Sequence, residues 1–335
     1  MRVAINGLGR IGRATLKMLM DAPDLELVAA NDLVPLDNLA YLLNYDTVYG
    51  RYEKRVSAGE DTLDIDGHTL RMFSEKDPER LPWEDLGIDL VLECTGVFTN
   101  REGLEKHLAA GAERAILSAP AKDDGVEWVV YGVNTPSSDA RMVTCASCTT
   151  NCIAPVVEVM DRRIGIAKST MTTIHAYTSS QEIVDGPHKK LRRGRAAAAN
   201  LVPTSTGAAK ATTKVLTELE GRFDGAAVRG PVPVGSIADI VLVTDRETSV
   251  EEVNGIFEEE SRTDRYNGIL GAVHDPLVSS DIIRDPRASI VDLEMTQVVG
   301  GDLVKVMSWY DNEWGYSAQM VRTAEFLARQ SAGAA

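Results

Sequence analysis

The sequence contains few aromatic residues, few cysteines and no long hydrophobic run. Aromatic side chains make up only 5% of the 335 residues. Four cysteines are too few for a disulfide framework in a chain of this length. No stretch approaches the roughly 18 uninterrupted apolar residues of a membrane-spanning helix, and the first segment, MRVAINGLGR, lacks the apolar core of a signal peptide. We therefore expect a cytoplasmic protein with reduced thiols.

Positive charge is also scarce. The chain has 35 Lys and Arg against 50 Asp and Glu, which gives a net charge of −15. This balance argues against nucleic acid or an anionic membrane as the main partner. An acidic, solubilising surface is the simplest explanation, and adaptation to high salt is the alternative. The apolar fraction of 44% is ample for a core, and the length fits two domains better than one.

The first half of the chain alternates strands with helices. Residues 2–5 form an apolar run that ends at Asn6-Gly7, a helical pattern covers 11–20, and a second apolar run covers 25–32. These segments form a βαβ unit. Further apolar runs lie at 89–96, 114–120, 128–134 and 141–147, with a helical segment at 103–112. The alternation predicts an α/β domain with a parallel, doubly wound sheet of the Rossmann type.

After about residue 150 the pattern changes to a helix followed mainly by strands. The helix ends at Gly165, and further helices are predicted at 249–262 and 314–330. The β-rich runs lie at 169–178, 225–245, 288–300 and 303–311. They predict an α+β catalytic domain with a mixed or antiparallel sheet. We assign residues 1–147 to the first domain, completed by a C-terminal helix at 313–335, and 148–312 to the second. The irregular segment 177–200 is long enough to suggest a functional loop or one covered by a partner.

A glycine-rich turn follows the first strand. Gly7, Gly9 and Gly12 have the spacing G-x-G-x-x-G and open a helix. The first glycine permits the tight turn, the second lets a pyrophosphate approach the backbone, and the third permits close helix–strand packing. Asp32 ends the second strand, where a carboxylate binds a ribose 2′-hydroxyl and repels a 2′-phosphate. The pattern predicts a dinucleotide site that favours NAD over NADP. The alternative is a tight turn before a capped helix, with no cofactor.

Three of the four cysteines lie within eight positions. Cys145 and Cys148 have the spacing C-x-x-C, but a structural zinc site needs four ligands and no second pair exists. No thioredoxin-like context supports a redox pair. We therefore expect no metal site.

Position along the chain separates these thiols. Cys145 lies in an apolar run and Cys152 lies one turn into a helix, so both are expected to pack as small hydrophobic residues. Cys148 lies at the start of that helix, where the dipole and free N–H groups lower a thiol pKa from about 8.5. Cys148 is the candidate nucleophile, and His175, near the end of the next strand, is the best candidate for its base. The remaining histidines are expected to be structural: His68, His107, His188 and His274.

Six motifs together resemble one family. They are NGLGRIGR at the start, ASCTTN at 146–151, HAYT at 175–178, LRRGRAAAAN at 191–200, PTSTGAAKA at 203–211 and SWYDNEWGYS at 308–317. In order and spacing the chain resembles the phosphorylating glyceraldehyde-3-phosphate dehydrogenases. The resemblance implies NAD- and phosphate-dependent oxidation of glyceraldehyde 3-phosphate to 1,3-bisphosphoglycerate, in glycolysis or gluconeogenesis. It implies a hemithioacetal and then a thioester on Cys148, with His175 as the base.

The same resemblance implies binding residues and an assembly. For the substrate phosphate it implies Thr178, Arg193 and Arg229, and for the attacking phosphate Ser147, Thr149, Thr206 and Gly207. For NAD it implies Asn6, Arg10 and Ile11 beside the three glycines, Asp32 at the adenosine ribose, Thr95, Gly96 and Ser118 at strand ends, and Asn312 with Tyr316 at the nicotinamide. It also implies a homotetramer with the segment 177–200 at its centre. Erythrose-4-phosphate dehydrogenase is the alternative activity, although HAYT and PTSTGAAKA favour an enzyme that also binds inorganic phosphate.

Four positions depart from the family's pattern. Ser179-Ser180 stand where Asn-Asp is usual, so a carboxylate that would orient the arginines is missing. Gly186-Pro187 replace Leu-Pro, which removes an apolar contact near the adenosine. Cys145 replaces a more usual Asn, and its thiol could form a disulfide with Cys148 under oxidation.

Overall fold

The computed structural model describes residues 1–333, which form two compact units. The first unit comprises Met1–Tyr131, Thr135–Ala146 and the chain from Met320 onward. The second comprises Gly132–Asn134 and Ser147–Gln319. Residues 334 and 335 of the expected C-terminal helix lie outside the described residues, and the functional domain limits at 147 and 312 stay a prediction.

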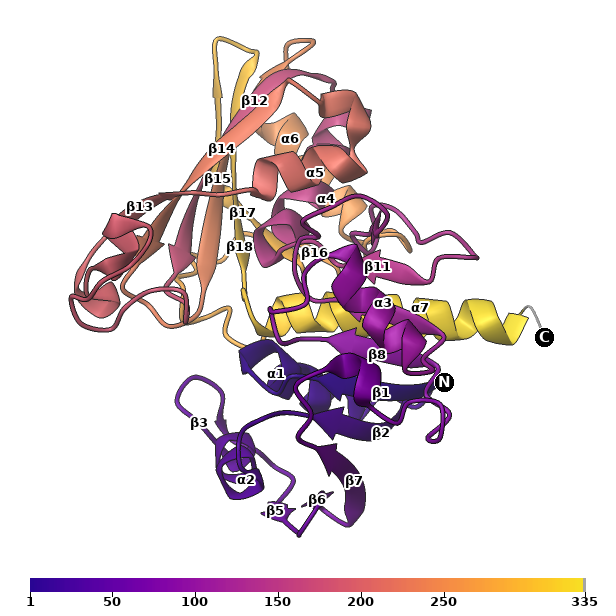
Figure 1. The fold of residues 1–335 in the computed structure, drawn as a ribbon. Coiled ribbons are helices and arrows are strands. Elements are labelled where there is room, and N and C mark those ends of the chain that lie inside the picture. Colours follow the sequence, from indigo (N-terminus) through magenta and orange to yellow (C-terminus); the bar gives the residue numbers. More distant parts are fainter. Residues whose placement is uncertain (334–335) are drawn as a thin grey trace. The chain divides into compact units, whose positions relative to one another are not determined.

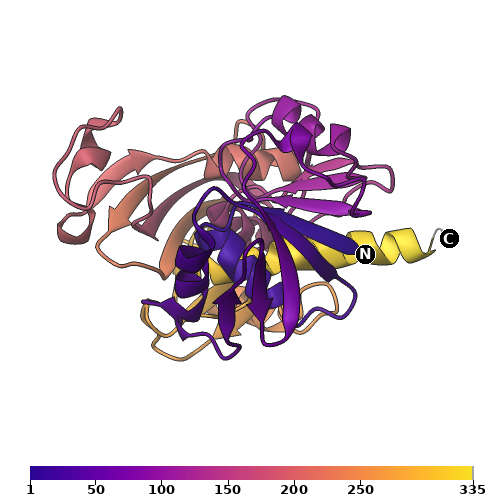
Figure 2. The same cartoon turned by 60° about the horizontal axis from the view of Figure 1, so that its bottom comes forward.

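The first unit is built on one sheet with the strand order β10-β11-β9-β8-β1-β2-β7-β6-β5. The strands from β10 to β7 are parallel, and β6 and β5 continue the sheet antiparallel (Figures 1 and 2). Their bounds are β1 Arg2–Asn6, β2 Glu26–Asn31, β5 Val56–Ala58, β6 Thr62–Ile65, β7 His68–Phe73, β8 Leu90–Glu93, β9 Arg114–Leu117, β10 Glu127–Trp128 and β11 Met142–Thr144. The chain proceeds from β1 to β2 on one side and later to β8 on the other. The carboxyl ends of β1 and β8 therefore form the topological switch point where such sheets bind ligands.

This architecture confirms the predicted doubly wound domain. The central strands are apolar on both faces, with Val3, Ile5 and Val91 wholly buried, because both sides of a parallel sheet are covered. The remaining elements are α1 Arg10–Leu19, α2 Leu36–Asn44, α3 Arg101–Ala109, the 3₁₀ turn η1 Pro78–Arg80 and the hairpin of β3 Tyr45–Asp46 with β4 Gly50–Arg51.

Two predicted elements of the first unit are corrected. The helix expected at 103–112 begins earlier, at Arg101, because the Asn100 side chain caps it by accepting a hydrogen bond from the Gly103 N–H at 3.1 Å. The strand expected at 128–134 shrinks to Glu127–Trp128. A turn follows, in which Gly132 has a φ of 86° that interrupts an extended strand.

The second unit contains a seven-stranded sheet with the order β13-β14-β12-β15-β18-β17-β16. The pairs β12–β14 and β16–β17 are parallel and the others antiparallel, which confirms the predicted mixed sheet. Its strands are β12 Ile166–Ala176, β13 Val202–Ser205, β14 Phe223–Gly230, β15 Ser236–Thr244, β16 Leu270–Val273, β17 Ser289–Val299 and β18 Leu303–Tyr310. The run expected at 225–245 is two strands, β14 and β15, because a turn that includes Gly235 at a φ of 91° separates them.

Helices of the second unit lie along one face of this sheet (Figure 1). They are α4 Cys148–Arg163, α5 Ala208–Val215 and α6 Val250–Glu260, while α7 Trp314–Gly333 begins in this unit and continues into the first. Along β15 every second residue is buried and the intervening ones are half-buried, so the opposite face is less covered. The segment 177–200 is irregular, as predicted, apart from two short 3₁₀ turns, η2 Leu191–Gly194 and η3 Ala197–Ala199; a third, η4 Thr217–Leu219, follows α5. Among the described residues, no helix has the length and apolarity needed to cross a membrane.

Candidate active site

A cysteine and a histidine meet at the start of α4. Cys148 is the first residue of this helix, and the Ser147 hydroxyl caps the helix by accepting a hydrogen bond from the Thr150 N–H at 3.0 Å. Cys148 is partly exposed. Its Sγ lies 3.3 Å from Nε2 of His175, which is the penultimate residue of β12. The sequence therefore predicted correctly that these two side chains would come together.

The surroundings of His175 determine which ring nitrogen carries the proton. Nδ1 lies 2.7 Å from the carbonyl oxygen of Ala176, which can only accept, and 2.8 Å from Nη1 of Arg229, which can only donate. Arg229 Nη1 also donates to that carbonyl at 2.9 Å, and we assign the Nδ1 proton to the shorter contact, with the Ala176 carbonyl. With the proton on Nδ1, the Nε2 lone pair faces the thiol. His175 is thus placed to accept the proton of Cys148.

The electrostatics correct one expectation. Burial raises the pKa of the Cys148 thiol, and the positive charge of Arg229 and hydrogen bonds with Thr149 lower it without offsetting burial. The predicted lowering of this pKa by the helix end alone is therefore wrong, because desolvation opposes it. Burial and the charge of Arg229 also lower the pKa of His175 to about 3, so the imidazole is neutral at physiological pH. The neutral imidazole has a free site for a proton, but its lowered pKa and the raised pKa of the thiol both oppose complete transfer before the substrate binds.

Tyr310 supports this pair, although the sequence analysis assigned it no role. Its buried hydroxyl lies 2.8 Å from Oγ1 of Thr149 on α4 and 2.8 Å from Oγ1 of Thr173 on β12. Its ring meets the His175 ring edge-on, with centroids 5.9 Å apart. The last residue of β18 faces the buried side of an alternating strand, and a buried tyrosine needs a polar partner. That alternation was the available signal for Tyr310.

A cationic cluster lies beside the pair. Arg229 is on β14, and its Nε is buried with no hydrogen-bond partner among the described residues. Arg193, in η2, donates from Nε to Thr204 Oγ1 at 3.1 Å and from Nη1 to Ser180 Oγ at 3.2 Å. The Thr178 and Ser180 hydroxyls are 2.9 Å apart. Arg193 and Arg229 bond hydroxyl and carbonyl oxygens and form no ion pair with a carboxylate among the described residues, an arrangement suited to an anionic ligand.

The other predicted phosphate residues lie at two helix starts. Ser147 and Thr149 belong to the first turn of α4, and their hydroxyls bond Thr150 and Tyr310 respectively. Gly207 immediately precedes α5, and the preceding Thr206 hydroxyl accepts from the Ala208 N–H at 3.1 Å. The two helices contact one another. Both helix starts present N–H groups that can bind anions.

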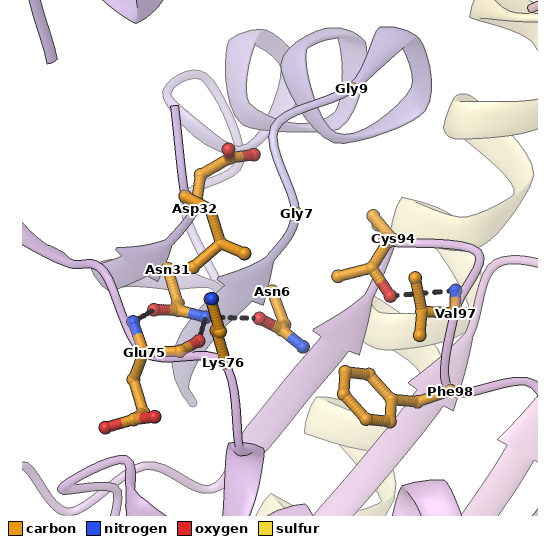
Figure 3. A pocket seen from close by; sticks show the side chains of 12 residues that line it. Asn6, Gly7, Gly9, Asn31, Asp32, Glu75, Lys76, Cys94, Val97 and Phe98 are labelled. Carbon is orange, nitrogen blue, oxygen red and sulfur yellow. Dashed lines mark hydrogen bonds between the residues drawn. The ribbon is translucent and has the colours of Figure 1, made fainter. Parts of the chain in front are cut away.

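A cavity of about 350 Å³ opens at the switch point of the first unit (Figure 3). Five predicted cofactor residues line it: Asn6, Gly7, Gly9, Asp32 and Thr95. The rest of the lining was not predicted and consists of Asn31, Leu33, Glu75, Lys76, Cys94, Val97 and Phe98. Several of these residues follow the carboxyl ends of β7 and β8. Because ligands bind at the carboxyl ends of strands in sheets of this kind, that position was the signal that could have found them.

The three glycines differ in what surrounds them. Gly7 has a φ of 93°, and a Cβ there would lie 2.7 Å from the Thr95 nitrogen. A Cβ on Gly12 would lie 1.9 Å from the Gly7 carbonyl oxygen, so the helix touches the turn. A Cβ on Gly9 would meet nothing within 4 Å, although Gly9 lines the cavity. Gly9 thus leaves open space beside the start of α1, where a pyrophosphate could be held.

Asp32 is fixed by the backbone. Its carboxylate accepts from the Leu8 N–H at 2.6 Å and from the Val34 N–H at 2.9 Å. These bonds hold an acceptor at the edge of the cavity (Figure 3), as a ribose hydroxyl would require.

The remaining predicted cofactor residues do not line this cavity. Arg10 pairs with Asp46, and its guanidinium lies 5.4 Å from the Tyr49 ring centroid. Ile11 follows it in α1, Gly96 lies after β8 with a φ of 70°, and Ser118 follows β9. Their cofactor roles stay predictions.

Asn312 and Tyr316 belong to the second unit. The Asn312 Oδ1 accepts from the Ser236 hydroxyl at 2.9 Å and from the Gly235 N–H at 3.2 Å, and its Nδ2 has no partner among the described residues. These two hydrogen bonds orient the Asn312 side chain and leave its Nδ2 group able to donate to a ligand. Tyr316 is buried in the first turn of α7.

Comparison with known proteins decides the family. Residues 1–101 match the glyceraldehyde 3-phosphate dehydrogenase NAD binding domain, and residues 147–312 match the C-terminal domain of the same family. The chain is 48% identical to the glyceraldehyde-3-phosphate dehydrogenase of Streptomyces coelicolor, with 98% of this chain and 99% of the relative covered. The corresponding proteins of Thermotoga maritima and Zymomonas mobilis are 48% and 45% identical, each with 98% of this chain covered and with 99% and 98% of the relative covered.

The chain belongs to the glyceraldehyde-3-phosphate dehydrogenase family. Its first unit therefore contains the NAD-binding domain of that family, which is an oxidoreductase family. The predicted NAD cofactor and the family resemblance are confirmed.

The other thiols of this family member are buried. Cys94, Cys145 and Cys152 form no disulfide among the described residues and are 9%, 1% and 0% exposed, and burial raises the pKa values of Cys145 and Cys152 to about 12. Packing of Cys145 and Cys152 is confirmed, whereas the disulfide between Cys145 and Cys148 stays a prediction. Within residues 1–333, no three His, Cys, Asp or Glu side chains are grouped to hold a metal ion.

Proposed function

We propose that this protein is a phosphorylating glyceraldehyde-3-phosphate dehydrogenase that converts D-glyceraldehyde 3-phosphate, NAD and phosphate to 1,3-bisphosphoglycerate and NADH. The distance of 3.3 Å between Cys148 Sγ and the free lone pair of His175 Nε2 is the observation that supports it most directly. An ordinary alcohol dehydrogenase needs no such nucleophile. The family assignment supports the same activity.

The proposed reaction passes through a covalent intermediate on Cys148. His175 Nε2 accepts the thiol proton as Sγ attacks the aldehyde carbon, and the new hemithioacetal oxygen takes up that proton. Bound NAD would supply the acceptor for the hydride of this carbon. His175 removes the hydroxyl proton. A thioester remains. Phosphate then attacks the thioester carbonyl and releases the acyl phosphate, and Cys148 regains its proton from His175.

The cationic cluster is proposed to hold the substrate's phosphate. Thr178, Arg193 and Arg229 supply hydroxyl and guanidinium donors, and the unpartnered Nε of Arg229 would gain an acceptor. For the attacking phosphate we propose Ser147, Thr149, Thr206 and Gly207, which lie at the starts of α4 and α5. Helix starts suit a dianion because the helix dipole and free N–H groups both favour negative charge.

For NAD, we propose that the cavity beside Gly9 and Asp32 holds the adenosine half and the pyrophosphate. The spare Nδ2 donor of Asn312 would hold the nicotinamide carboxamide, with Tyr316 beside it. In the proposed assembly, a homotetramer, the segment around 177–200 would contact other subunits. Four apolar side chains near that segment are more than half exposed: Ile183, Val184, Leu191 and Leu201. Exposed apolar side chains concentrated in one segment of the chain would be covered by such an interface.

A panel of substrates and cofactors tests the proposal. Wild type should reduce NAD only with both glyceraldehyde 3-phosphate and phosphate present, and Cys148→Ser should lose this activity. Erythrose 4-phosphate and NADP are the comparison arms, and a preference for either would contradict the assignment. Full activity of Cys148→Ser, or turnover without phosphate or another acyl acceptor, would refute the mechanism. Light scattering should give the mass of four chains, and a monomer would contradict the proposed assembly.

A further inference from the structure

A buried polar network lies beside the cavity of the first unit, and the proposed reaction does not use it. The neighbouring parallel strands β8, β1 and β2 each end in a polar residue: Glu93, Asn6 and Asn31, which are paired in register. Their exposures are 0%, 1% and 4%. Burial of three polar side chains in one row costs free energy unless each is hydrogen-bonded. Their partners therefore explain why the chain tolerates them at the switch point.

Glu93 is the acceptor on which the network converges. Its Oε1 accepts from the Thr95 N–H at 2.8 Å and from the Thr95 hydroxyl. Its Oε2 accepts from Asn6 Nδ2 at 2.6 Å and from His107 Nε2 at 3.0 Å. Four donors occupy the roughly four acceptor positions of a carboxylate. No described lysine or arginine pairs with Glu93, so these donors alone stabilise its buried charge.

The direction of each hydrogen bond is fixed. Trp83 Nε1 can only donate, and it lies 3.1 Å from His107 Nδ1, so Nδ1 must accept. The ring proton of neutral His107 is therefore on Nε2, which donates to Glu93. Asn6 accepts on Oδ1 from Asn31 Nδ2 at 2.8 Å, which turns its own Nδ2 toward Glu93. Asn6 Nδ2 and His107 Nε2 lie 3.4 Å apart because both donate to the same oxygen.

The network reaches the cavity on both sides. Asn6 and Thr95 line it directly, and the Thr95 hydroxyl accepts from the N–H of Val97, another lining residue, at 3.0 Å. On the opposite side, Asn31 accepts from the Glu75 N–H at 2.8 Å and donates to the Glu75 carbonyl at 2.9 Å. Figure 3 shows Asn6 and Asn31 between the segments that carry Glu75 and Val97. Neither Glu93 nor His107 lines the cavity.

We propose that Glu93 and His107 are positioning residues of the cofactor site: the Nε2-protonated imidazole orients the carboxylate, and the carboxylate orients Asn6 and the turn at Thr95. The inference rests on the proposed function only for the identity of the ligand, NAD. The pair acts on cofactor affinity and leaves the chemistry at Cys148 unchanged, because all its contacts lie within the first unit. His107 was expected to be structural, and this assignment adds a specific effect on the binding site.

Glu93→Gln tests the carboxylate. The amide keeps the size but presents N–H groups to the donors of either Thr95 or Asn6 and His107, so one side of the network loses its acceptor. The disordered network should reduce the free energy of NAD binding by about 1–2 kcal/mol, which corresponds to about a 5- to 30-fold higher Kd for NAD in a calorimetric titration. The KM for NAD should rise, while kcat, the KM for glyceraldehyde 3-phosphate and the rate of Cys148 alkylation stay at the wild-type values. His68→Gln is the matched control, because the His68 side chain bonds only the Leu27 carbonyl among the described residues and does not line the cavity.

His107 offers a loss and a rescue. His107→Leu removes the donor and should weaken NAD binding as Glu93→Gln does, whereas His107→Gln can still donate to Glu93 and should recover most of the affinity. A folded Glu93→Gln or His107→Leu with wild-type affinity overturns the inference. Where neither variant folds, wild-type NMR decides: a His107 ring protonated on Nε2 supports the inference, and a ring protonated on Nδ1 refutes it. Weak NAD binding by a folded His107→Gln also contradicts the inference. Failure of the wild type itself to bind NAD would instead refute the proposed function.

Discussion

Replacing His175 tests whether a neutral base activates the nucleophile. Burial raises the pKa of the Cys148 thiol, so little thiolate exists at neutral pH without proton transfer. His175 Nε2, at 3.3 Å, is the only described nitrogen base bonded to Sγ. Asparagine at 175 would place its amide near the position of Nδ1, where it can still donate to the Ala176 carbonyl but cannot reach the sulfur. Glutamine would reach the sulfur but has no basic lone pair.

The magnitude follows from the role of a general base. A positioned base contributes typically about 10²–10⁴-fold, so both His175→Asn and His175→Gln should slow alkylation of Cys148 by iodoacetamide at least about 100-fold. At about 1.36 kcal/mol for each tenfold change in rate, a slowing of 10²–10⁴-fold raises the activation free energy by about 3–5 kcal/mol. His188→Asn is the control, because His188 is a partly exposed residue of the 177–200 segment whose side chain bonds only Lys190 among the described residues.

Two outcomes would refute this reasoning. A His175→Asn rate within about threefold of wild type, under 1 kcal/mol, would exclude His175 as the base. A His175→Gln rate near wild type with a slow His175→Asn would mean that a hydrogen bond at the Nε2 position, rather than basicity, activates the thiol. Circular dichroism spectra that match the wild type would establish that the variants are folded.

Three further predictions follow from single contacts. Gly9→Ala should keep the wild-type melting temperature but weaken NAD binding, because the new Cβ meets no atom within 4 Å. Gly12→Ala should lower the melting temperature, because its Cβ would lie 1.9 Å from the Gly7 carbonyl oxygen. Arg229→Leu should raise the KM for glyceraldehyde 3-phosphate about 10- to 150-fold, because a hydrogen bond to a charged group is lost, and should change the KM for unphosphorylated glyceraldehyde little. Equal effects on the two KM values would contradict the phosphate role of Arg229. Glu260→Gln should cost about 1–2 kcal/mol of unfolding free energy at neutral pH, because buried Glu260 accepts from Arg162 at 2.8 Å but Arg162 is partly exposed. That bond lowers the Glu260 pKa, so its contribution to the unfolding free energy is present above the ordinary carboxyl pKa and is lost as pH falls through the lowered pKa. In urea melts, the difference in unfolding free energy between wild type and Glu260→Gln should therefore shrink in acid. A difference that does not change with pH would contradict this linkage.

The parts of the fold that sequence predicted are those with long, uniform patterns. β1 and β8 are continuous apolar runs, and the glycine turn marks the start of α1, so the doubly wound sheet could be inferred. The antiparallel strands β5 and β6 and the helix α2 were not predicted. β5 and β6 have only three and four residues, which is too short for a reliable alternation. In α2, Leu39, Ala40 and Leu43 are buried at helical spacing, so a signal existed there.

The active site was predicted where motif and position agree, and was missed where contacts are long-range. Cys148 and His175 lie 27 positions apart, and their elements, a helix start and a strand end, indicate the meeting place. Tyr310 reaches Thr149 across 161 positions, and the alternation of β18 indicates that Tyr310 is buried but does not encode this partner. The sign of the Cys148 pKa shift was missed for a related reason, since the burial that raises this pKa comes from the packed unit rather than from the helix start.

Charge placement reconciles an acidic chain with an anionic substrate. A net charge of −15 repels a phosphate ester at long range, so binding depends on local cations. The family's usual carboxylate beside these arginines is replaced here by Ser180, whose hydroxyl receives a hydrogen bond from Arg193 and contacts Thr178. A hydroxyl can orient a guanidinium without neutralising it, so the positive charges of Arg193 and Arg229 remain available to the ligand. In the proposed phosphate site, a serine in place of a carboxylate at position 180 would therefore strengthen the local attraction for phosphate in a protein whose overall charge opposes it.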